Sequence, residues 1–356
     1  MPNVIAIFPG HRRDFGACEI YRTTMPYYYL QKKHPEWKTS WAFIEDILDM
    51  SKSQGTDVIK EVIQTYDLFV FPRLYFTDPK SFEAFQVLIE SLNYLGKKAI
   101  YEVDDDMSND TRVVVDGDAI SAASLCNAIT VTTPYLAWLM HMKTGKKTYI
   151  LPNMFGPDAW YEKLVGTFRY SDRIVLGLTG SSTHNDDWKV LETVLPDLLL
   201  DDRIHLILMG YHPDYLKDLP NSTLLPGMAY EKYTQVIQSC DIILAPLNDD
   251  AFNLSKSPIK CIEGMAARRI LGGVPHGAAC IASNHPVYQL AITSEKNGLL
   301  VEHTPEGWKT GLERLINDQA LRNKLQFSGH EWVDRHHNIT KTVSLWRNVY
   351  NSVIQN

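Results

Sequence analysis

The sequence predicts an α/β protein made of two doubly wound, Rossmann-like domains. The chain has 356 residues, which exceeds the size of one ordinary domain. Short apolar runs alternate with helix-length segments, a pattern typical of parallel sheets covered by helices. The alternation begins at Val4 and restarts at Arg173. We therefore expect one domain at residues 1–160 and a second at 170–338.

The composition is that of a globular protein, with 45% apolar and 22% charged residues. A net charge of -7 argues against a global basic field for nucleic acid or anionic membranes. The five cysteines lack metal-ligand spacing, which indicates reduced core thiols. No signal peptide opens the sequence, and no apolar run approaches the ~20 residues that span a bilayer. We expect a cytoplasmic protein.

In the first domain, the apolar runs predict a strand at Val4–Phe8 and a loop before the next helix. This loop contains Gly10 and Gly16 and is the most basic of the domain, with His11, Arg12, Arg13 and Arg22. It lies where doubly wound folds bind phosphates or substrates, but it is not G-x-G-x-x-G, so a nicotinamide site is not indicated. A solvated charge run is the alternative.

Further strands are expected at Ser40–Ile44, Asp67–Phe71 and Lys97–Val103, and helices at Thr56–Thr65 and Pro79–Leu95. The last strand runs into a carboxylate cluster formed by Glu102, Asp104, Asp105 and Asp106. Crowded carboxylates repel one another, which raises the pKa of one of them. The cluster has three competing interpretations: it binds a divalent cation, it positions or deprotonates an acceptor hydroxyl, or it only forms a turn.

The second domain repeats the pattern, with a first strand that starts at Arg173 and leads into a loop containing Gly177, Gly180, Ser181, Ser182 and His184. Further strands are expected at Ile204–Gly210, Ser222–Gly227, Asp241–Leu247, Ala279–Ser283 and Asn297–Glu302. Gly180 and Ser181 follow its first strand, and such small residues let backbone N–H groups approach a phosphate. We expect His184, in the same loop, to be structural.

The most informative stretch is Phe252–Gly264. A polar loop precedes a helix predicted to start at Ser257, with Pro258 in its first position. Lys256 lies beside this start, and Lys260 and Glu263 share one helix face. A helix N-terminus attracts anions, so the stretch indicates a diphosphate site with a carboxylate one turn away. A solvated surface pair is the alternative.

This stretch, with the following Gly272, Gly273, Pro275 and Ala279–Ser283, resembles the donor site of GT-B glycosyltransferases, and within them family four (glycosyl transferases group 1). The resemblance implies two domains facing across a cleft, with residues 340–356 packing back on the first. It also implies that Glu263 holds a ribose and that Lys256 and Lys260 meet the diphosphate. Residues Met209, Tyr211 and Met228 then lie beside the nucleotide base. Asp104, Asp105 and Asp106, which the resemblance places at the acceptor hydroxyl, are assigned as catalytic residues together with Lys256 and Lys260. Gly16, Arg12, Arg13 and Arg22 are assigned to the acceptor side.

Two departures from the family stand out. Ser255 replaces the first Glu of E-x7-E, and the turn after the helix carries an insertion that includes Arg268 and Arg269.

The resemblance implies a retaining transferase that uses a UDP- or GDP-sugar, without a cofactor and without a required metal. The expected acceptor is a glycan or lipid-linked glycan. One alternative is a hydroxymethylated base of phage DNA, which would need a basic surface beside the cleft. A catalytically lapsed nucleotide-sugar-binding protein and a sugar-nucleotide epimerase are alternatives of other classes.

Overall fold

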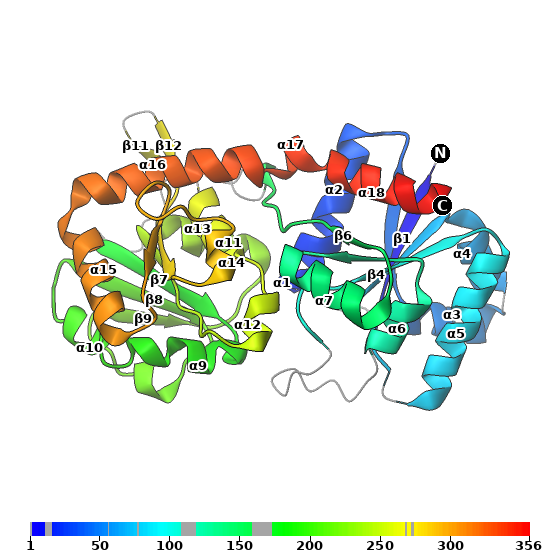
Figure 1. Ribbon diagram of the computed structural model, residues 1–356, viewed down its shortest axis with the longest axis horizontal. Coiled ribbons are helices and arrows are strands. Elements are labelled where there is room, and N and C mark those ends of the chain that lie inside the picture. Colours follow the sequence, from blue (N-terminus) through cyan, green and yellow to red (C-terminus); the bar gives the residue numbers. More distant parts are fainter. Residues whose placement is uncertain are drawn as a thin grey trace. The chain divides into compact units, whose positions relative to one another are not determined.

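The computed structural model describes residues 2–10, 16–55, 57–76, 78–107, 119–158, 173–267, 269–271 and 274–356, with 269–271 and 275 given by their backbone only. The chain divides into two compact units. The first comprises Met1–Asn153, Ser255–Ser257 and Ile339–Asn356, and the second comprises Met154–Leu254 and Pro258–Asn338. Each unit has its own six-stranded sheet (Figure 1). The predicted α/β architecture with two parallel, doubly wound sheets is confirmed.

The first sheet has the order β2-β1-β3-β4-β5-β6, and all its pairings are parallel. Nearly all residues of β1, β3 and β4 are buried, because these strands are apolar on both faces. The winding direction changes between β1 and β3, and ligands bind outside the carboxyl ends of strands at such a point. The strands are β1 (Asn3–Phe8), β2 (Lys38–Phe43), β3 (Leu68–Pro72), β4 (Lys98–Glu102), β5 (Ala128–Val131) and β6 (Thr148–Ile150).

Two helices of the first unit, α5 and α7, begin at residues that cap them. Asp78 accepts a hydrogen bond from the N–H of Ser81, and Thr133 accepts one from the N–H of Leu136. The C-terminal helices pack against α2, as Figure 1 shows for α18. The helices are α1 (Ala17–Glu19), a π-helix η1 (Ile20–Thr24), α2 (Met25–Lys33), α3 (Ile44–Gln54), α4 (Asp57–Thr65), α5 (Pro79–Tyr94), α6 (Ala119–Leu125), α7 (Pro134–Thr144), α17 (Ile339–Thr342) and α18 (Ser344–Gln355).

The second sheet has the order β14-β13-β10-β7-β8-β9, again with parallel pairings. Its winding direction changes between β7 and β10. The inserted turn after α13 forms a separate antiparallel hairpin of β11 (Arg269–Leu271) and β12 (Val274–His276). The sheet strands are β7 (Ile174–Gly180), β8 (Ile204–Gly210), β9 (Ser222–Leu225), β10 (Ile242–Ala245), β13 (Ala279–Ser283) and β14 (Leu299–Val301).

Helices of the second unit are short near β7 and long near the end of the chain. They are η2 (Ser182–His184), α9 (Asn185–Trp188), η3 (Lys189–Leu191), α10 (Leu195–Leu198), η4 (Asp214–Leu216), α11 (Tyr230–Ser239), α12 (Ala251–Ser255), α13 (Ile259–Ala266), α14 (Pro286–Gln289), α15 (Pro305–Asn317) and α16 (Gln319–His336).

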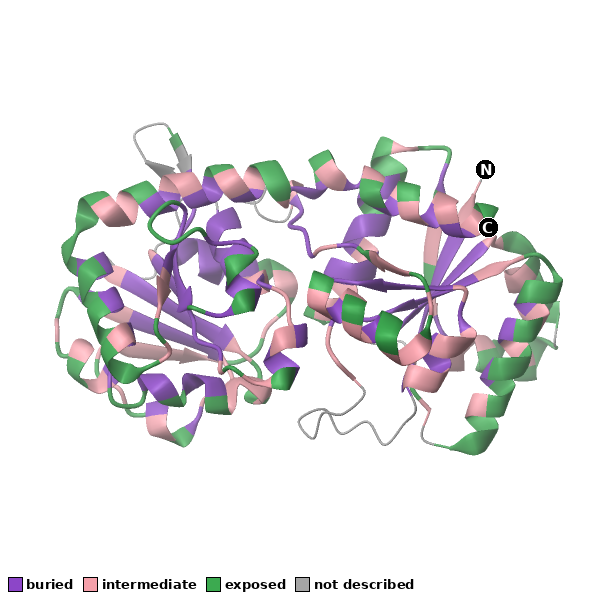
Figure 2. Ribbon diagram, viewed as in Figure 1, coloured by how far each residue is buried: buried purple, intermediate pink, exposed green. Residues whose placement is uncertain are grey.

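The core of the second unit lies on both faces of its sheet, as the purple strands in Figure 2 show. Along β10, Ile242 and Leu244 join one apolar cluster, and Ile243 and Ala245 join the other. This alternation confirms that β10 is buried on both faces. Cys126, Cys240, Cys261 and Cys280 are buried, whereas Cys18 is partly exposed.

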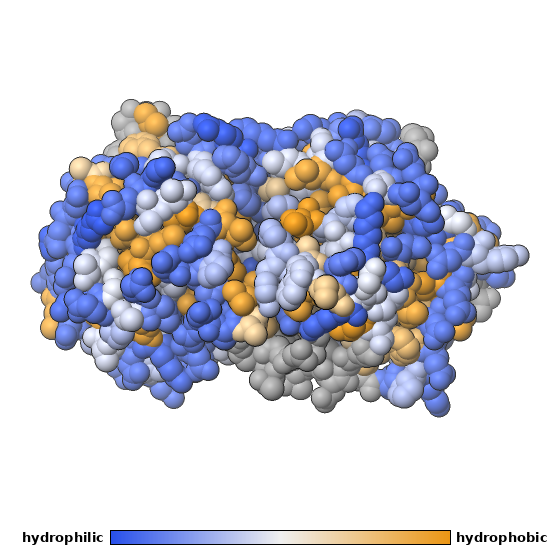
Figure 3. Space-filling view, in the orientation of Figure 1, coloured by the Kyte–Doolittle hydropathy of each residue, from blue (hydrophilic) through white to orange (hydrophobic). Residues whose placement is uncertain are grey.

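Hydrophilic residues cover much of the face seen in Figure 3, with smaller hydrophobic areas among them. None of the described helices is both long enough and apolar enough to cross a membrane.

Candidate functional site

Two glycines bring together the first two loops of the second unit, at the carboxyl edge of its sheet. Gly180 ends β7 and is paired with Gly210, which ends β8. Gly210 has a φ of +97°, and a Cβ at this residue would lie 2.3 Å from the carbonyl oxygen of Gly180. The same carbonyl accepts a hydrogen bond from the N–H of Tyr211 at 2.8 Å. Position 210 therefore requires glycine, and the two loops meet through their backbones.

The other residues predicted to contact the donor lie on or near this edge. Ser181 is exposed, and its hydroxyl lies 2.8 Å from that of Thr183. The Tyr211 hydroxyl donates to Asn185 Oδ1 at 3.1 Å. Met209 is buried in the core, and Met228 is partly buried against the same cluster. Among these side chains, those of Ser181, Tyr211 and Met228 reach the surface. Met209 packs in the apolar core beneath this edge of the sheet.

A polar cluster surrounds the first turns of α13. Lys260 Nζ lies 3.3 Å from Glu263 Oε2, which confirms the predicted pairing of these residues on one helix face. Tyr233 of α11 donates its hydroxyl to the same oxygen at 2.5 Å and accepts from Lys260 Nζ at 3.2 Å. Thr179, near the end of β7, lies 3.3 Å from the Tyr233 hydroxyl. Glu263 is buried, and Lys260 balances its charge.

The start of α13 differs from the prediction. Pro258 is the N-cap residue, the helix begins at Ile259, and Ser257 does not cap it. The Ser257 hydroxyl instead accepts from Asn153 Nδ2 at 2.9 Å, and both residues belong to the first unit. Lys256 lies on this segment. The residues before it form α12, where the sequence had indicated a loop.

Asp187, which the sequence analysis did not select, joins two loops of the second unit. Its buried carboxylate accepts from His184 Nδ1 at 2.8 Å, the N–H of Asn248 at 3.0 Å and Asn253 Nδ2 at 2.8 Å. Burial acts to raise the pKa of Asp187, but these hydrogen bonds outweigh it and the pKa is lowered. His184 is thus held by a buried carboxylate, which fits the structural role expected for it.

The first unit gathers charges at the carboxyl ends of β3 and β4. Arg73 follows β3 and lies 2.8 Å from Asp104 Oδ1 and 2.6 Å from Asp105 Oδ2. Its φ of 48° is in the left-handed region that non-glycine residues rarely adopt. Burial works to raise the pKa of Asp104, but Arg73 and Arg22 bring it below the usual value. Burial and the Asp104 charge raise the pKa of Asp105. Of these two carboxylates, Asp105 is therefore the one better suited to accept a proton near neutral pH.

Glu102 and Arg22 form a buried ion pair with a separation of 2.7 Å. Arg22 also donates to Asn153 Oδ1 at 3.0 Å. The expectation that Arg22 adds to a basic surface is therefore wrong, since its side chain is buried in the first unit and committed to Glu102. Asp106 lies 3.6 Å from Lys143, and its N–H donates to Ser255 at 2.8 Å.

The remaining residues of the basic loop are only partly described. Gly16 is exposed and precedes α1. Arg12, Arg13 and Arg268 lie outside the described residues, and of Arg269 only the backbone is described.

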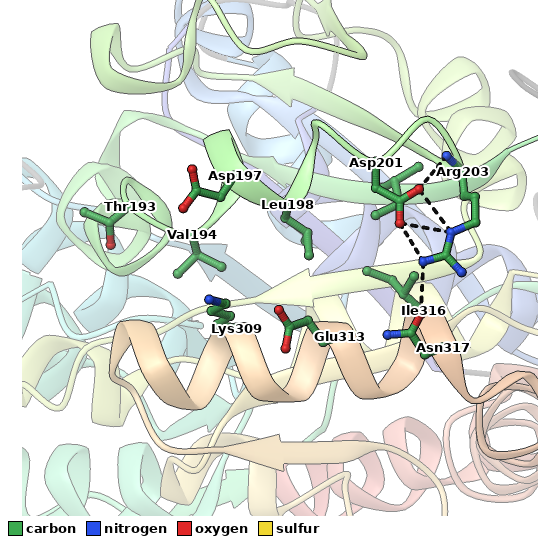
Figure 4. A pocket seen from close by; sticks show the side chains of 11 residues that line it. Thr193, Val194, Asp197, Leu198, Asp201, Arg203, Lys309, Glu313, Ile316 and Asn317 are labelled. Carbon is green, nitrogen blue, oxygen red and sulfur yellow. Dashed lines mark hydrogen bonds and ion pairs between the residues drawn. The ribbon is translucent and has the colours of Figure 1, made fainter.

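Within the described part of the chain, no three His, Cys, Asp or Glu residues are arranged to hold a metal ion. A hollow of about 340 Å³ lies between α15 and the segment Thr193–Ile204 (Figure 4). Asp201, Arg203 and Asn317 are joined by hydrogen bonds at one side of it. Ile204 begins β8, so the hollow lies at the amino ends of the strands. Ligands of such sheets bind at the carboxyl ends, which separates it from the candidate site.

Sequence reasoning missed Arg73, Tyr233 and Asp187. Arg73 could have been found by the argument that selected Asp104, since it directly follows an apolar strand. Asp187 follows the glycine loop after β7, yet no local pattern distinguishes it from Asp186. Tyr233 carries no signal, because its contact with Glu263 joins helices 30 residues apart.

The comparisons with known proteins identify a glycosyltransferase domain and a shared fold. Residues 173–318 match the family model described as "Glycosyl transferases group 1". The sequence has no significant match among curated proteins.

Solved structures with a similar fold align over nearly the whole chain. Sucrose-phosphate synthase from Thermosynechococcus elongatus has 14% identity, a TM-score of 0.63 and 99% coverage of both chains. HepE of Anabaena, in complex with UDP and glucose, has 11% identity and a TM-score of 0.63, over 99% of this chain and 100% of that one. A glycosyltransferase from Rickettsia africae has 13% identity and a TM-score of 0.63, over 100% of this chain and 99% of that one.

Proposed function

We propose that this chain, a glycosyltransferase of the GT-B fold with a group 1 domain at residues 173–318, moves a sugar from a nucleoside-diphosphate sugar to an acceptor hydroxyl. The donor is a UDP- or GDP-sugar, and the acceptor is a glycan or a lipid-linked glycan. UDP is favoured, because the similar Anabaena HepE was crystallised with UDP and with UDP-glucose.

The observation that carries the proposal is the cluster of Lys260 and Glu263 at the start of α13. It lies past the carboxyl end of β10, where a doubly wound sheet binds its ligand. Lys260 supplies a cation for the diphosphate, which gains charge as it leaves the sugar. The buried Glu263 supplies an acceptor for ribose hydroxyls. Gly180 and Gly210 keep side chains from separating the neighbouring loops.

The first unit is proposed to bind the acceptor through Asp105 and its neighbours. Asp105 has a raised pKa and is paired with Arg73, so its carboxylate is held in place. It is suited to accept a hydrogen bond from the attacking hydroxyl. Asp104 is the largest cause of the raised pKa of Arg73, and Arg73 in turn lowers the pKa of Asp104. We therefore assign Asp104 to holding that arginine in place.

Retention of anomeric configuration is proposed from the family resemblance. The position eight residues before Glu263 is Ser255, whose hydroxyl accepts from the N–H of Asp106. Position 255 therefore supplies no carboxylate to bind the donor sugar. In this chain other groups make that contact. Lys260 and the start of α13 carry the charge of the diphosphate, so a bound metal is not required.

The test is a donor-hydrolysis and transfer assay with a panel of UDP- and GDP-sugars, followed by proton NMR of the anomeric product. Release of free nucleoside diphosphate with one donor, and an anomer that matches that donor, is the expected result. Binding without turnover for every donor and acceptor tried would contradict the proposed activity. An inverted anomer would contradict only the stereochemistry.

A further inference from the structure

Tyr233 occupies the centre of the cluster assigned to the nucleotide. Its hydroxyl lies within 3.3 Å of three groups from two elements: Glu263 and Lys260 of α13, and Thr179 of β7. Lys260 Nζ also lies 5.4 Å from the centroid of the Tyr233 ring, over its face. Tyr233 thus contacts both residues proposed to bind the donor.

The direction of these hydrogen bonds follows from charge. A carboxylate only accepts and an ammonium only donates, so the Tyr233 hydroxyl donates to Glu263 and accepts from Lys260. Burial, followed by the Glu263 charge, raises the pKa of Tyr233 well above its usual value, which keeps the donated proton in place. One oxygen of Glu263 is therefore fixed by a donor that cannot ionise at physiological pH.

Fixing Glu263 in advance lowers the entropy cost of binding a ribose hydroxyl. A free carboxylate rotates about its side-chain bonds and loses entropy when it binds a hydroxyl. Here Tyr233 and Lys260 already hold Oε2, so the carboxylate is restricted before a ligand arrives. Binding energy from ribose hydroxyls is then not spent on ordering Glu263.

We propose that Tyr233 is a positioning residue that makes Glu263 selective for nucleotides with ribose hydroxyls. This inference rests on the proposed function, in which Glu263 receives the ribose. It adds a residue from α11 and a measurable property, the discrimination between a nucleotide and its 2′,3′-dideoxy analogue.

The experiment measures the dissociation constants of UDP and of 2′,3′-dideoxy-UDP by calorimetry, or of the GDP pair if GDP binds more tightly. Wild type is compared with Tyr233→Phe, Glu263→Gln and Tyr149→Phe. The last variant is the matched control, because it also removes one tyrosine hydroxyl with a hydrogen bond, to Ser352 of the first unit at 2.9 Å. Thermal unfolding of each variant confirms that it is folded.

Wild type and Tyr149→Phe are expected to prefer the ribonucleotide by about tenfold or more, the effect of one charge-assisted hydrogen bond. Glu263→Gln should lose most of this preference, and Tyr233→Phe should reduce it to about threefold or less. If Glu263→Gln loses the preference and Tyr233→Phe keeps it, the inference is wrong and the proposed function stands. Equal weakening of both ligands by Tyr233→Phe would mean a merely structural role. If Glu263→Gln keeps the preference, the ribose assignment itself is wrong.

Discussion

Replacing Lys260 with alanine is expected to weaken binding of the nucleoside diphosphate by between about tenfold and about a hundredfold. The Lys260 side chain is only 21% exposed and lies between Glu263 Oε2 at 3.3 Å and the Tyr233 hydroxyl at 3.2 Å. Such a partly desolvated ammonium makes charge-assisted contacts worth about 1.5–3 kcal/mol. Since about 1.4 kcal/mol corresponds to a factor of ten, the affinity range follows directly.

The assay is isothermal calorimetry with UDP and GDP at one fixed salt concentration. Lys260→Arg should recover part of the lost affinity, because it restores the charge. The matched control is Lys309→Ala, which removes an exposed lysine beside the hollow at the other end of the second sheet. Unchanged affinity in a folded Lys260→Ala variant would refute the assignment of the diphosphate to α13.

Three further outcomes are expected. Excess EDTA should leave transferase activity largely intact, and a full loss that magnesium or manganese restores would reverse the interpretation of the acidic cluster. Arg73→Ala should lower the free energy of unfolding by about 3 kcal/mol in urea titrations, because it leaves Asp104 buried without its partner; a change below about 0.5 kcal/mol would contradict the ion pair. Asp187→Asn should destabilise the protein at pH 7. The folded-state pKa of Asp187 is lowered, so its contribution is present above the unfolded pKa and is lost as the pH falls through the folded pKa. The difference from wild type should therefore shrink in acid, and a difference that grows in acid would count against the assigned hydrogen bonds.

The parallel sheets were predictable because their strands are buried on both faces and read as continuous apolar runs. The prediction for β8, Ile204–Gly210, matches the structure residue for residue. Helix α3 was missed, since no capping residue precedes it and Phe43 occupies its N-cap position. Residues 182–198 form four short helical pieces rather than one continuous helix. The local sequence gives no signal for this division into short helices.

In the candidate site, the sequence predicted residues on one helix and residues at strand ends. The pair of Lys260 and Glu263 follows from helical spacing alone. Arg22 was misjudged, because its burial depends on Glu102, 80 residues away. The Ser257 cap was wrong for a similar reason, since its hydroxyl is used by Asn153. Contacts between distant segments decide these roles, and composition and periodicity do not contain them.

The most direct test of the account is a crystal structure of this chain with UDP, or with GDP if that ligand binds more tightly. We expect a diphosphate within hydrogen-bonding distance of Lys260 at the start of α13, and ribose hydroxyls on Glu263. A nucleotide bound in the hollow beside α15, or at any site away from these two residues, would contradict it.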